Sequence, residues 1–356
     1  MNVVFRVDAS NEIGAGHVVR CKVLAKKLLE RGHHCSFVCA DLKGNHISML
    51  KKDGYKVYSI LPKLNEIKNH NEANDIISCK NLVLFEKVDW VIVDHYYLGF
   101  NWQAFIKSLN VKLFVIDDRI FTSINADIFL NQNFKNNQKI IINNKKCIHL
   151  IGPKYVLIRA EFQKNINKSL LKKKQQKLQN LFICMGGGDS FKETIEAIEG
   201  VINANKFWET VNIIVGKACS NINFIENIVK DKVGWSLHVQ TKKIAKLLRD
   251  ADLAITGGGS ICWEKCILGV PSLVKIIEEN QRSNSNILEK MGCHIVIKTN
   301  KKLASHEYSR LINELDLKRN YEMSLKSSLI CDSLGSLRIV VEMEKYFLTN
   351  GYSNNV

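Results

Sequence analysis

The chain has 356 residues, of which 46% are hydrophobic, and its 51 Lys and Arg outnumber its 35 Asp and Glu to give a net charge of +16. This length is typical of two domains, and no hydrophobic run approaches the ~20 residues that cross a bilayer. The first residues also lack the basic and hydrophobic segments of a signal peptide. We therefore expect a cytoplasmic protein without an integral membrane segment.

The positive charge is spread over the whole chain, without an arginine-rich or aromatic-interleaved motif. This favours an anionic small substrate and no nucleic acid, although a basic nucleic-acid-binding protein is an alternative that predicts steep salt dependence. The 11 cysteines include no CxxC pair, and Cys262 and Cys266 lack a partner pair at zinc-like spacing. We expect buried, reduced thiols, no metal ion and no cofactor.

In the first half, short hydrophobic runs alternate with helical patterns. The runs predict strands at residues 3–7, 34–39, 55–60, 90–94, 112–116 and 127–130. The first helix is expected to begin at His17 and to end before Gly32. Its buried face would carry Cys21, Leu24, Ala25, Leu28 and Leu29, and its polar face Arg20, Lys26, Lys27 and Glu30. Residues 163–180 are polar and basic and read as a partly helical linker.

The second half repeats the alternation of strands and helices. Its predicted strands are residues 181–185, 211–215, 235–239, 253–256, 272–276 and 294–297. Alternation in both halves indicates an α/β protein with two Rossmann-type parallel-sheet domains facing a central cleft, where ligands bind beyond the C-terminal strand ends. We expect domains at 1–162 and 181–335, joined by the linker 163–180, and a final helix in 336–356 that packs back on the first domain.

A glycine loop with Gly14 and Gly16 lies between the first strand and the first helix, and His17 follows it. This order directs backbone N–H groups and the positive end of a helix toward an anionic ligand. The dinucleotide fingerprint requires a third glycine where Val19 stands, so a nicotinamide site is not expected. His17 is a candidate catalytic residue; the alternative is a helix-start residue bonded to a neighbour.

A second glycine loop, residues 257–259, follows the strand 253–256 and includes Gly258 and Gly259. Ser260 is a good helix N-cap, and backbone N–H groups there can hold phosphate. Glu264 lies one turn further on, and its carboxylate can accept two hydroxyl hydrogens, which suits the vicinal diol of a ribose. The alternative for Glu264 is a solvated helix charge.

Polar or glycine-rich residues follow several other predicted strands. Gly186 and Gly187 begin a further backbone nest, for which plain tight-turn glycines are the alternative. The strand ends also carry Asp94, Tyr96, Asp117, Asp118, Asn280 and Gln281. Aspartates at strand ends also form turns, and the two amides also suit a helix cap, so the binding and structural interpretations both stand.

Together these motifs resemble the UDP-2,4-diacetamido-2,4,6-trideoxy-β-L-altropyranose hydrolases of pseudaminic acid biosynthesis. The similarity spans most of the chain in order, at residues 5–10, 13–17, 20–21, 24–25, 93–96, 117–118, 130–133, 152–155, 157–159, 161–162, 257–260, 263–264, 266, 268–272 and 279–281. One departure is residues 185–189, where the family pattern has an aromatic residue before fewer glycines. Residues 61–87 match no part of that pattern.

The resemblance implies the GT-B fold, which the glycosyltransferase that makes lipid II shares. It further implies that His17 is the general base, that Arg159 and Glu264 contact the substrate, and that the second domain holds UDP. The expected reaction is metal-independent attack of water on the anomeric carbon of a UDP-activated diamino sugar, with inversion. A GT-B glycosyltransferase that uses a UDP-sugar donor is the alternative. Neither the stereochemistry of the sugar nor the oligomeric state follows from the sequence.

Overall fold

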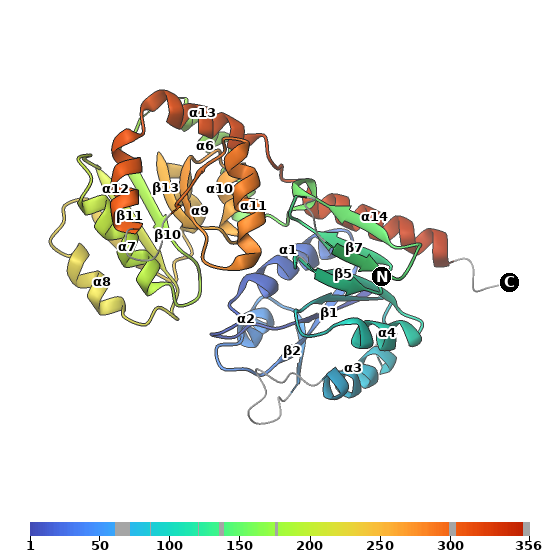
Figure 1. Ribbon diagram of the computed structural model, residues 1–356. Coiled ribbons are helices and arrows are strands. Elements are labelled where there is room, and N and C mark those ends of the chain that lie inside the picture. Colours follow the sequence, from blue (N-terminus) through green and yellow to red (C-terminus); the bar gives the residue numbers. More distant parts are fainter. Residues whose placement is uncertain are drawn as a thin grey trace. The chain divides into compact units, whose positions relative to one another are not determined.

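The computed structural model describes residues 1–60, 72–85, 87–119, 121–134, 139–174, 177–298 and 304–351. The chain forms two compact units (Figure 1). Unit 1 comprises Met1–Leu157 and Leu334–Val356, and unit 2 comprises Ile158–Ser333. The sequence placed this division at residue 162 and assigned 163–180 to a linker, whereas the structure includes those described residues in unit 2. Of the unmatched segment 61–87, residues 61–71 and residue 86 lie outside the described residues.

Unit 1 is built on a seven-stranded sheet in the order β3-β2-β1-β4-β5-β7-β9. All of its neighbouring strands are parallel. The strands are β1 (Asn2–Val7), β2 (His34–Ala40), β3 (Lys56–Ile60), β4 (Trp90–Asp94), β5 (Lys112–Ile116), β7 (Ile128–Asn131) and β9 (Ile148–Ile151). A separate parallel pair joins β6 (Phe121–Ile124) to β8 (Lys139–Ile142). The parallel sheet confirms the predicted fold class for this unit.

Helices cover both faces of this sheet, because alternate residues along each strand point to opposite sides. Val3, Phe5 and Val7 belong to the core that contains α1 and α14, whereas Val4 packs in a second core with α3 and α4. The helices of unit 1 are α1 (Gly16–Glu30), α2 (Ile47–Lys52), α3 (Glu72–Phe85), α4 (Phe100–Ser108), α14 (Gly335–Gly351) and the 3-10 turn η1 (Pro153–Tyr155). The last helix of the chain therefore packs on unit 1 (Figure 1).

Unit 2 contains a six-stranded sheet in the order β12-β11-β10-β13-β14-β15, again with parallel neighbours. Its strands are β10 (Asn180–Cys184), β11 (Thr210–Val215), β12 (Trp235–Val239), β13 (Leu253–Gly257), β14 (Ser272–Lys275) and β15 (Ile295–Val296). All six lie where the sequence predicts them, within one or two residues at each end. The predicted second parallel sheet is thus confirmed.

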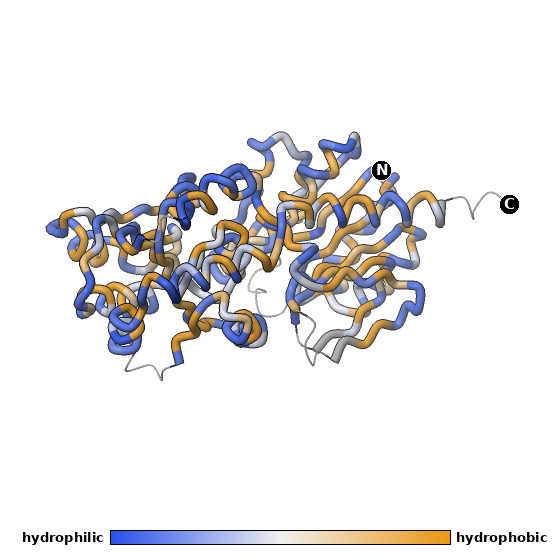
Figure 2. Tube along the Cα trace, turned by 90° about the horizontal axis from the view of Figure 1, so that it is seen from above, coloured by the Kyte–Doolittle hydropathy of each residue, from blue (hydrophilic) through white to orange (hydrophobic). Residues whose placement is uncertain are grey.

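The helices of unit 2 are α5 (Ala160–Gln163), α6 (Ile166–Lys173), α7 (Phe191–Ile202), α8 (Ile222–Val229), α9 (Ile244–Asp250), α10 (Ile261–Ile267), α11 (Glu279–Lys290), α12 (Ala304–Glu314) and α13 (Leu317–Ser328). Alternate residues of β10 and β11 form a core with α7, α8 and α12. Figure 2 shows hydrophobic residues in both units, which agrees with a separate core in each. No helix of the described residues is long and apolar enough to cross a membrane.

Two predictions for α1 are wrong in detail. Leu29, expected on the buried face, is 45% exposed. Arg20, expected on the polar outer face, turns toward the end of β4 and forms an ion pair with the buried carboxylate of Asp94. Arg20 lies three residues after His17, so both side chains share one face of the helix. A charged residue at the border of a buried face can turn inward where a buried partner carries the opposite charge.

Candidate functional site

His17 is the second residue of α1, and a tight turn delivers it there from the end of β1. Gly14 has a φ of 77°, a conformation that residues with a side chain rarely adopt. Its N–H donates to the carbonyl of Ser10 at 2.8 Å, and the hydroxyl of Ser10 accepts from two following backbone N–H groups. Gly16 then begins the helix. The turn therefore fixes His17 beyond the C-terminal edge of the sheet, where parallel sheets bind ligands.

The imidazole of His17 forms a hydrogen bond with a fully buried carboxylate. Its Nδ1 lies 2.7 Å from Oδ1 of Asp94, the last residue of β4. The pairing of Val7 with Asp94 in neighbouring strands explains how two residues far apart in sequence meet at this edge. A carboxylate on Nδ1 favours the tautomer with the proton there and leaves Nε2 as the basic nitrogen. The sequence predicts both as candidate site residues, and the structure brings them together.

Arg20 binds the same carboxylate through two nitrogens. Its Nε and Nη2 donate to the two oxygens of Asp94, each at 2.6 Å. Although burial alone would raise the pKa of Asp94, the charge of Arg20 and the hydrogen bonds from Arg20 and His17 hold that pKa well below its usual value. Asp94 therefore stays charged over the whole physiological pH range. The sequence places Arg20 on the polar face of the helix and within the family-like motif at residues 20–21, but does not predict it as a site residue.

Tyr96 completes the surroundings of His17. The two rings meet edge to face, with centroids 4.7 Å apart, and the phenol donates to Oδ1 of Asp118 at 2.5 Å. The other oxygen of Asp118 accepts from Nη1 of Arg20 at 3.1 Å. Burial and the adjacent carboxylate raise the pKa of Tyr96 well above its usual value, so the phenol stays protonated and donates.

A second polar network lies behind this site and supports the loop that carries Tyr96. The guanidinium of Arg6, almost fully buried in β1, binds the carboxylates of Asp8 and Asp75. His95 Nε2 lies 3.0 Å from Asp8, while its Nδ1 accepts from the backbone N–H of Tyr97 at 3.2 Å. Since Nδ1 is an acceptor, His95 donates from Nε2 to Asp8. These bonds hold the loop after β4 in place beside α1.

In unit 2, two glycine loops meet at the C-terminal edge of the sheet. Gly186 and Gly187 follow β10, and Gly258 and Gly259 follow β13. A Cβ on Gly257 would lie 2.4 Å from the carbonyl of Met185, so the two loops pack backbone against backbone. The sequence predicted both loops but not this contact, which follows from the pairing of β10 with β13. Only glycine allows this close approach.

Arg159 and Glu264 form the charged part of unit 2 near these loops. Arg159 Nε donates to Oε1 of Glu264 at 2.7 Å, and its Nη1 donates to the more exposed Glu161 at 2.8 Å. Burial raises the pKa of Glu264 above its usual value, although the charge of Arg159 opposes that rise. Ser260 is the N-cap residue of α10, as predicted, but its side chain makes no cap hydrogen bond.

The first turns of α11 pack against the second glycine loop. A Cβ on Gly258 would lie 2.8 Å from the hydroxyl of Ser285 and 3.0 Å from the side chain of Gln281. Gln281 Oε1 also accepts from the N–H of Ile277 at 3.1 Å, and Asn280 lies beside it in α11. The structure therefore brings the predicted Gln281 to the predicted Gly258.

A buried pair ties α11 to α10 behind this loop. His294 Nε2 donates to the carbonyl of Ser285 at 2.8 Å, and its Nδ1 lies 2.9 Å from Nζ of the fully buried Lys265. Burial and the charge of Lys265 lower the pKa of His294 well below its usual value, so the imidazole is neutral. These contacts link α10 to α11 beside the second glycine loop.

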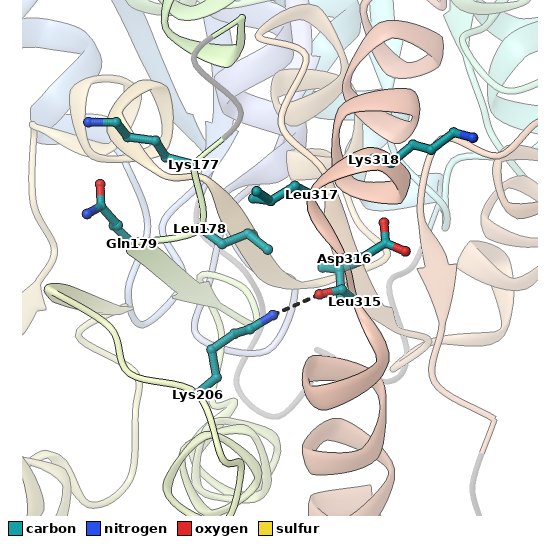
Figure 3. Close-up of a pocket in the computed structure, with 8 residues that line it drawn as sticks. All are labelled: Lys177, Leu178, Gln179, Lys206, Leu315, Asp316, Leu317 and Lys318. Carbon is teal, nitrogen blue, oxygen red and sulfur yellow. Dashed lines mark hydrogen bonds between the residues drawn. The ribbon is translucent and has the colours of Figure 1, made fainter.

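A pocket of about 750 Å³ lies elsewhere in unit 2 (Figure 3). Its walls are formed by Lys177–Gln179, which precede β10, by Lys206 and by Leu315–Lys318. It therefore lies at the N-terminal edge of the sheet, away from the glycine loops. Lys206 donates to the carbonyls of Ile312 and Leu315 at the end of α12. The ammonium group of Lys206 is thus bonded to the backbone that forms the pocket wall.

Comparisons with known proteins find relatives in sequence and in fold. No family model matches the chain. Over 303 residues, or 84% of this chain and 100% of the relative, it is 29% identical to UDP-2,4-diacetamido-2,4,6-trideoxy-β-L-altropyranose hydrolase of Campylobacter jejuni. The chain is therefore similar in sequence to that hydrolase over most of its length.

Two other relatives align with this chain over a similar number of residues. The chain is 23% identical over 302 residues to spore coat polysaccharide biosynthesis protein SpsG of Bacillus subtilis, covering 82% of each chain. It is 27% identical over 292 residues to an uncharacterized protein of Methanocaldococcus jannaschii. That match covers 79% of this chain but only 57% of the archaeal protein. The chain therefore spans little more than half the length of this relative.

Solved structures show the same fold. MurG of Acinetobacter baumannii superposes with a TM-score of 0.68 at 14% identity, over 97% of this chain and 99% of that chain. MnaA of S. aureus in complex with UDP gives a TM-score of 0.66 at 16% identity, over 98% and 97%. The chain therefore has the GT-B fold, as the sequence predicts.

Proposed function

We propose that this protein hydrolyses UDP-2,4-diacetamido-2,4,6-trideoxy-β-L-altropyranose to UDP and the free sugar, as a step of pseudaminic acid biosynthesis. The observation that carries the proposal is the His17–Asp94 pair at the C-terminal edge of the unit 1 sheet, in a chain similar in sequence to a hydrolase of that name. A glycosyltransferase with the same fold is the competing function, because the calicheamicin glycosyltransferase CalG4 superposes on the chain with a TM-score of 0.62.

In the proposed reaction His17 acts as the general base. Its Nε2 removes a proton from water while the water oxygen attacks the anomeric carbon of the sugar. The bond between that carbon and the β-phosphate oxygen breaks, and UDP leaves with the bonding electrons, so the sugar is inverted at this carbon. Asp94 holds Nδ1–H and stabilises the imidazolium that forms.

Unit 2 is proposed to hold UDP. Backbone N–H groups of the two glycine loops suit the diphosphate, and they would stabilise the negative charge that grows on the leaving group. Glu264 is proposed to accept the ribose hydroxyls, with Arg159, Ser260, Asn280 and Gln281 as further contacts. No group of three metal-ligating side chains exists among the described residues. The proposed chemistry assigns charge stabilisation to the backbone and needs no metal ion.

The proposed place of action is the cytoplasm. All 11 cysteines are free, nine of them buried and two half-buried. Free thiols persist in a reducing compartment. The diphosphate of the proposed substrate is negatively charged, and the excess of positive charge on the chain suits such a ligand.

A proton NMR time course tests the proposal. The full chain is incubated with the UDP-diacetamido sugar in H₂¹⁸O, without an acceptor and with a chelator present. We expect free UDP and the inverted sugar as the first product in the spectra, and mass spectrometry should find no ¹⁸O in the UDP. The matched variant His17→Asn should bind UDP normally and lose about 10²–10⁴-fold in turnover. Turnover only after an acceptor is added would support the transferase instead, and a chelator-sensitive rate would overturn metal independence.

A further inference from the structure

Arg20 connects every group that surrounds the imidazole of His17. It binds both oxygens of Asp94 and one oxygen of Asp118, and its Nη2 lies 3.2 Å from Nδ1 of His17. The second oxygen of Asp118 accepts from Tyr96, whose ring in turn contacts His17. These five side chains therefore form a closed ring of contacts, in which Arg20 alone touches both carboxylates.

We propose that Arg20 is a positioning residue for the hydrolysis, which fixes Asp94 and Asp118 so that the imidazole of His17 keeps one orientation. This inference rests on the proposed function. A guanidinium that donates two parallel hydrogen bonds prevents rotation of the carboxylate plane. Because Oδ1 of Asp94 is then fixed, Nδ1 of His17 can reach it in only one ring orientation, which leaves Nε2 free. Arg20 thus acts through Asp94 rather than on the sugar.

Arg20 also balances charge around the base. The groups facing the imidazole are Asp94 from β4, Tyr96 from the following loop and Arg20 from α1, with Asp118 on the far side of Arg20. Two carboxylates and one guanidinium leave one net negative charge. Without Arg20 the net charge is two negative, which favours the protonated imidazole. Loss of Arg20 therefore requires a higher pH before His17 can accept a proton.

Kinetics of two variants and one control test this role. Arg20→Met should lower kcat by about 10²-fold with little change in KM, since misorientation of the base affects the chemical step. The acid limb of its pH–rate profile should move to higher pH by about 1 unit or more. Arg20→Lys keeps the charge but not the two parallel bonds, so the limb should return toward the wild-type position while kcat stays low. Lys22, also on α1, pairs with Asp53 at the end of α2, and Lys22→Met should change neither quantity.

A purely structural role for Arg20 predicts a different result. It would give equal loss of kcat and of UDP binding, with no movement of the acid limb. That outcome, or near-normal kcat in Arg20→Met, overturns the proposal. Thermal unfolding and UDP calorimetry of each variant show whether it is folded.

A spectroscopic measurement keeps this inference separate from the proposed reaction. Long-range ¹H–¹⁵N spectra report the tautomer of each neutral histidine, and the His17 signals are assigned by their absence in His17→Asn. We expect the Nδ1–H tautomer in the wild type and a mixture of tautomers in Arg20→Met. If the wild type hydrolyses no UDP-sugar but the tautomer of His17 still changes in Arg20→Met, the positioning role stands and the proposed function fails. An unchanged tautomer in Arg20→Met contradicts the positioning role, whatever the reaction.

Discussion

Arg159 and Glu264 are 105 residues apart in sequence, yet the guanidinium Nε lies 2.7 Å from the carboxylate Oε1. The pair joins the segment before α5 to α10 within unit 2. Arg159 bonds to one oxygen of Glu264, and the same carboxylate has a second oxygen that can accept from a sugar hydroxyl. This relationship makes the proposed ribose contact testable without measuring turnover.

Glu264→Gln should weaken UDP binding by about 10-fold or more, because a charged acceptor is replaced by a neutral one. Calorimetry with UDP and with 2′-deoxy-UDP measures the effect. The loss should be smaller for the deoxy nucleotide, which lacks one of the two hydroxyls. Glu161→Gln is the matched control, since Glu161 also pairs with Arg159 but is more exposed. Equal losses for both nucleotides would exclude the ribose contact.

Asp94→Asn should lower kcat by about 10²–10⁴-fold while UDP affinity stays close to normal. The amide keeps the size of the side chain but can no longer stabilise an imidazolium or hold both His17 and Arg20 as a charged acceptor. Steady-state kinetics and UDP calorimetry on the variant measure the two quantities. Asp53→Asn, at a surface ion pair with Lys22, serves as control. Normal turnover in Asp94→Asn would remove the proposed role of the His17–Asp94 pair.

The sequence predicts the strands of both sheets well because each is a continuous hydrophobic run with strong β-forming residues, such as Trp90–Asp94. It misses β9, the edge strand of the seven-stranded sheet, and the pair of β6 with β8, which lies outside that sheet. Such peripheral segments take their structure from their neighbours rather than from their own pattern. The predicted strands of the two central sheets follow from periodicity, whereas these peripheral strands do not.

Some of the site residues could be predicted from the sequence and others could not. His17 and Asp94 follow recognisable signals, a glycine loop and a strand end. The inward turn of Arg20 does not, because the helical pattern assigns it to the polar face, and only the position of Asp94 in the fold reverses that assignment. The ion pair of Arg159 with Glu264 likewise depends on tertiary packing over a long sequence separation.

Unit 1 should lose stability on acidification through its buried carboxylates. Although burial alone would raise the pKa values of Asp8 and Asp94, Arg6 and Arg20 respectively hold them well below the usual value. The two charged carboxylates therefore stabilise the folded unit fully above the unfolded-state aspartate pKa of about 3.9. This stabilisation is lost as the pH falls below that value toward the lower pKa values of the two residues in the folded protein. Hydrogen exchange of β1 and β4, measured between about pH 7 and pH 3, follows unit 1 directly.

Asp8→Asn provides the comparison for this acid effect. It should be less stable than the wild type near neutral pH, since Arg6 and His95 lose a charged partner. Its stability should then decline less steeply below about pH 4, because one of the titrating groups is gone. A parallel decline of the two proteins would show that Asp8 does not contribute to acid sensitivity.

Gly200 should be required for packing within unit 2. It lies in α7, and a Cβ there would lie 2.4 Å from Cβ of Tyr308 and 2.9 Å from the carbonyl of Ser305, on the adjoining α12 segment. Because Tyr308 is fully buried and one of the contacts is backbone, neither neighbour can move aside cheaply. Gly200→Ala should therefore lower the free energy of unfolding by about 1–3 kcal/mol, even though alanine is the better helix former.

Gly188→Ala is the matched control, because a Cβ at that position meets no atom within 4 Å. Chemical denaturation of both variants, followed by hydrogen exchange in α7 and α12, measures the difference. We expect the destabilisation in Gly200→Ala alone, with faster exchange confined to unit 2. If instead Gly200→Ala is as stable as the wild type, the contact between α7 and α12 must relax at little energetic cost. Tyr308 would then be free to shift, and the close packing of these two helices would not limit the stability of the unit.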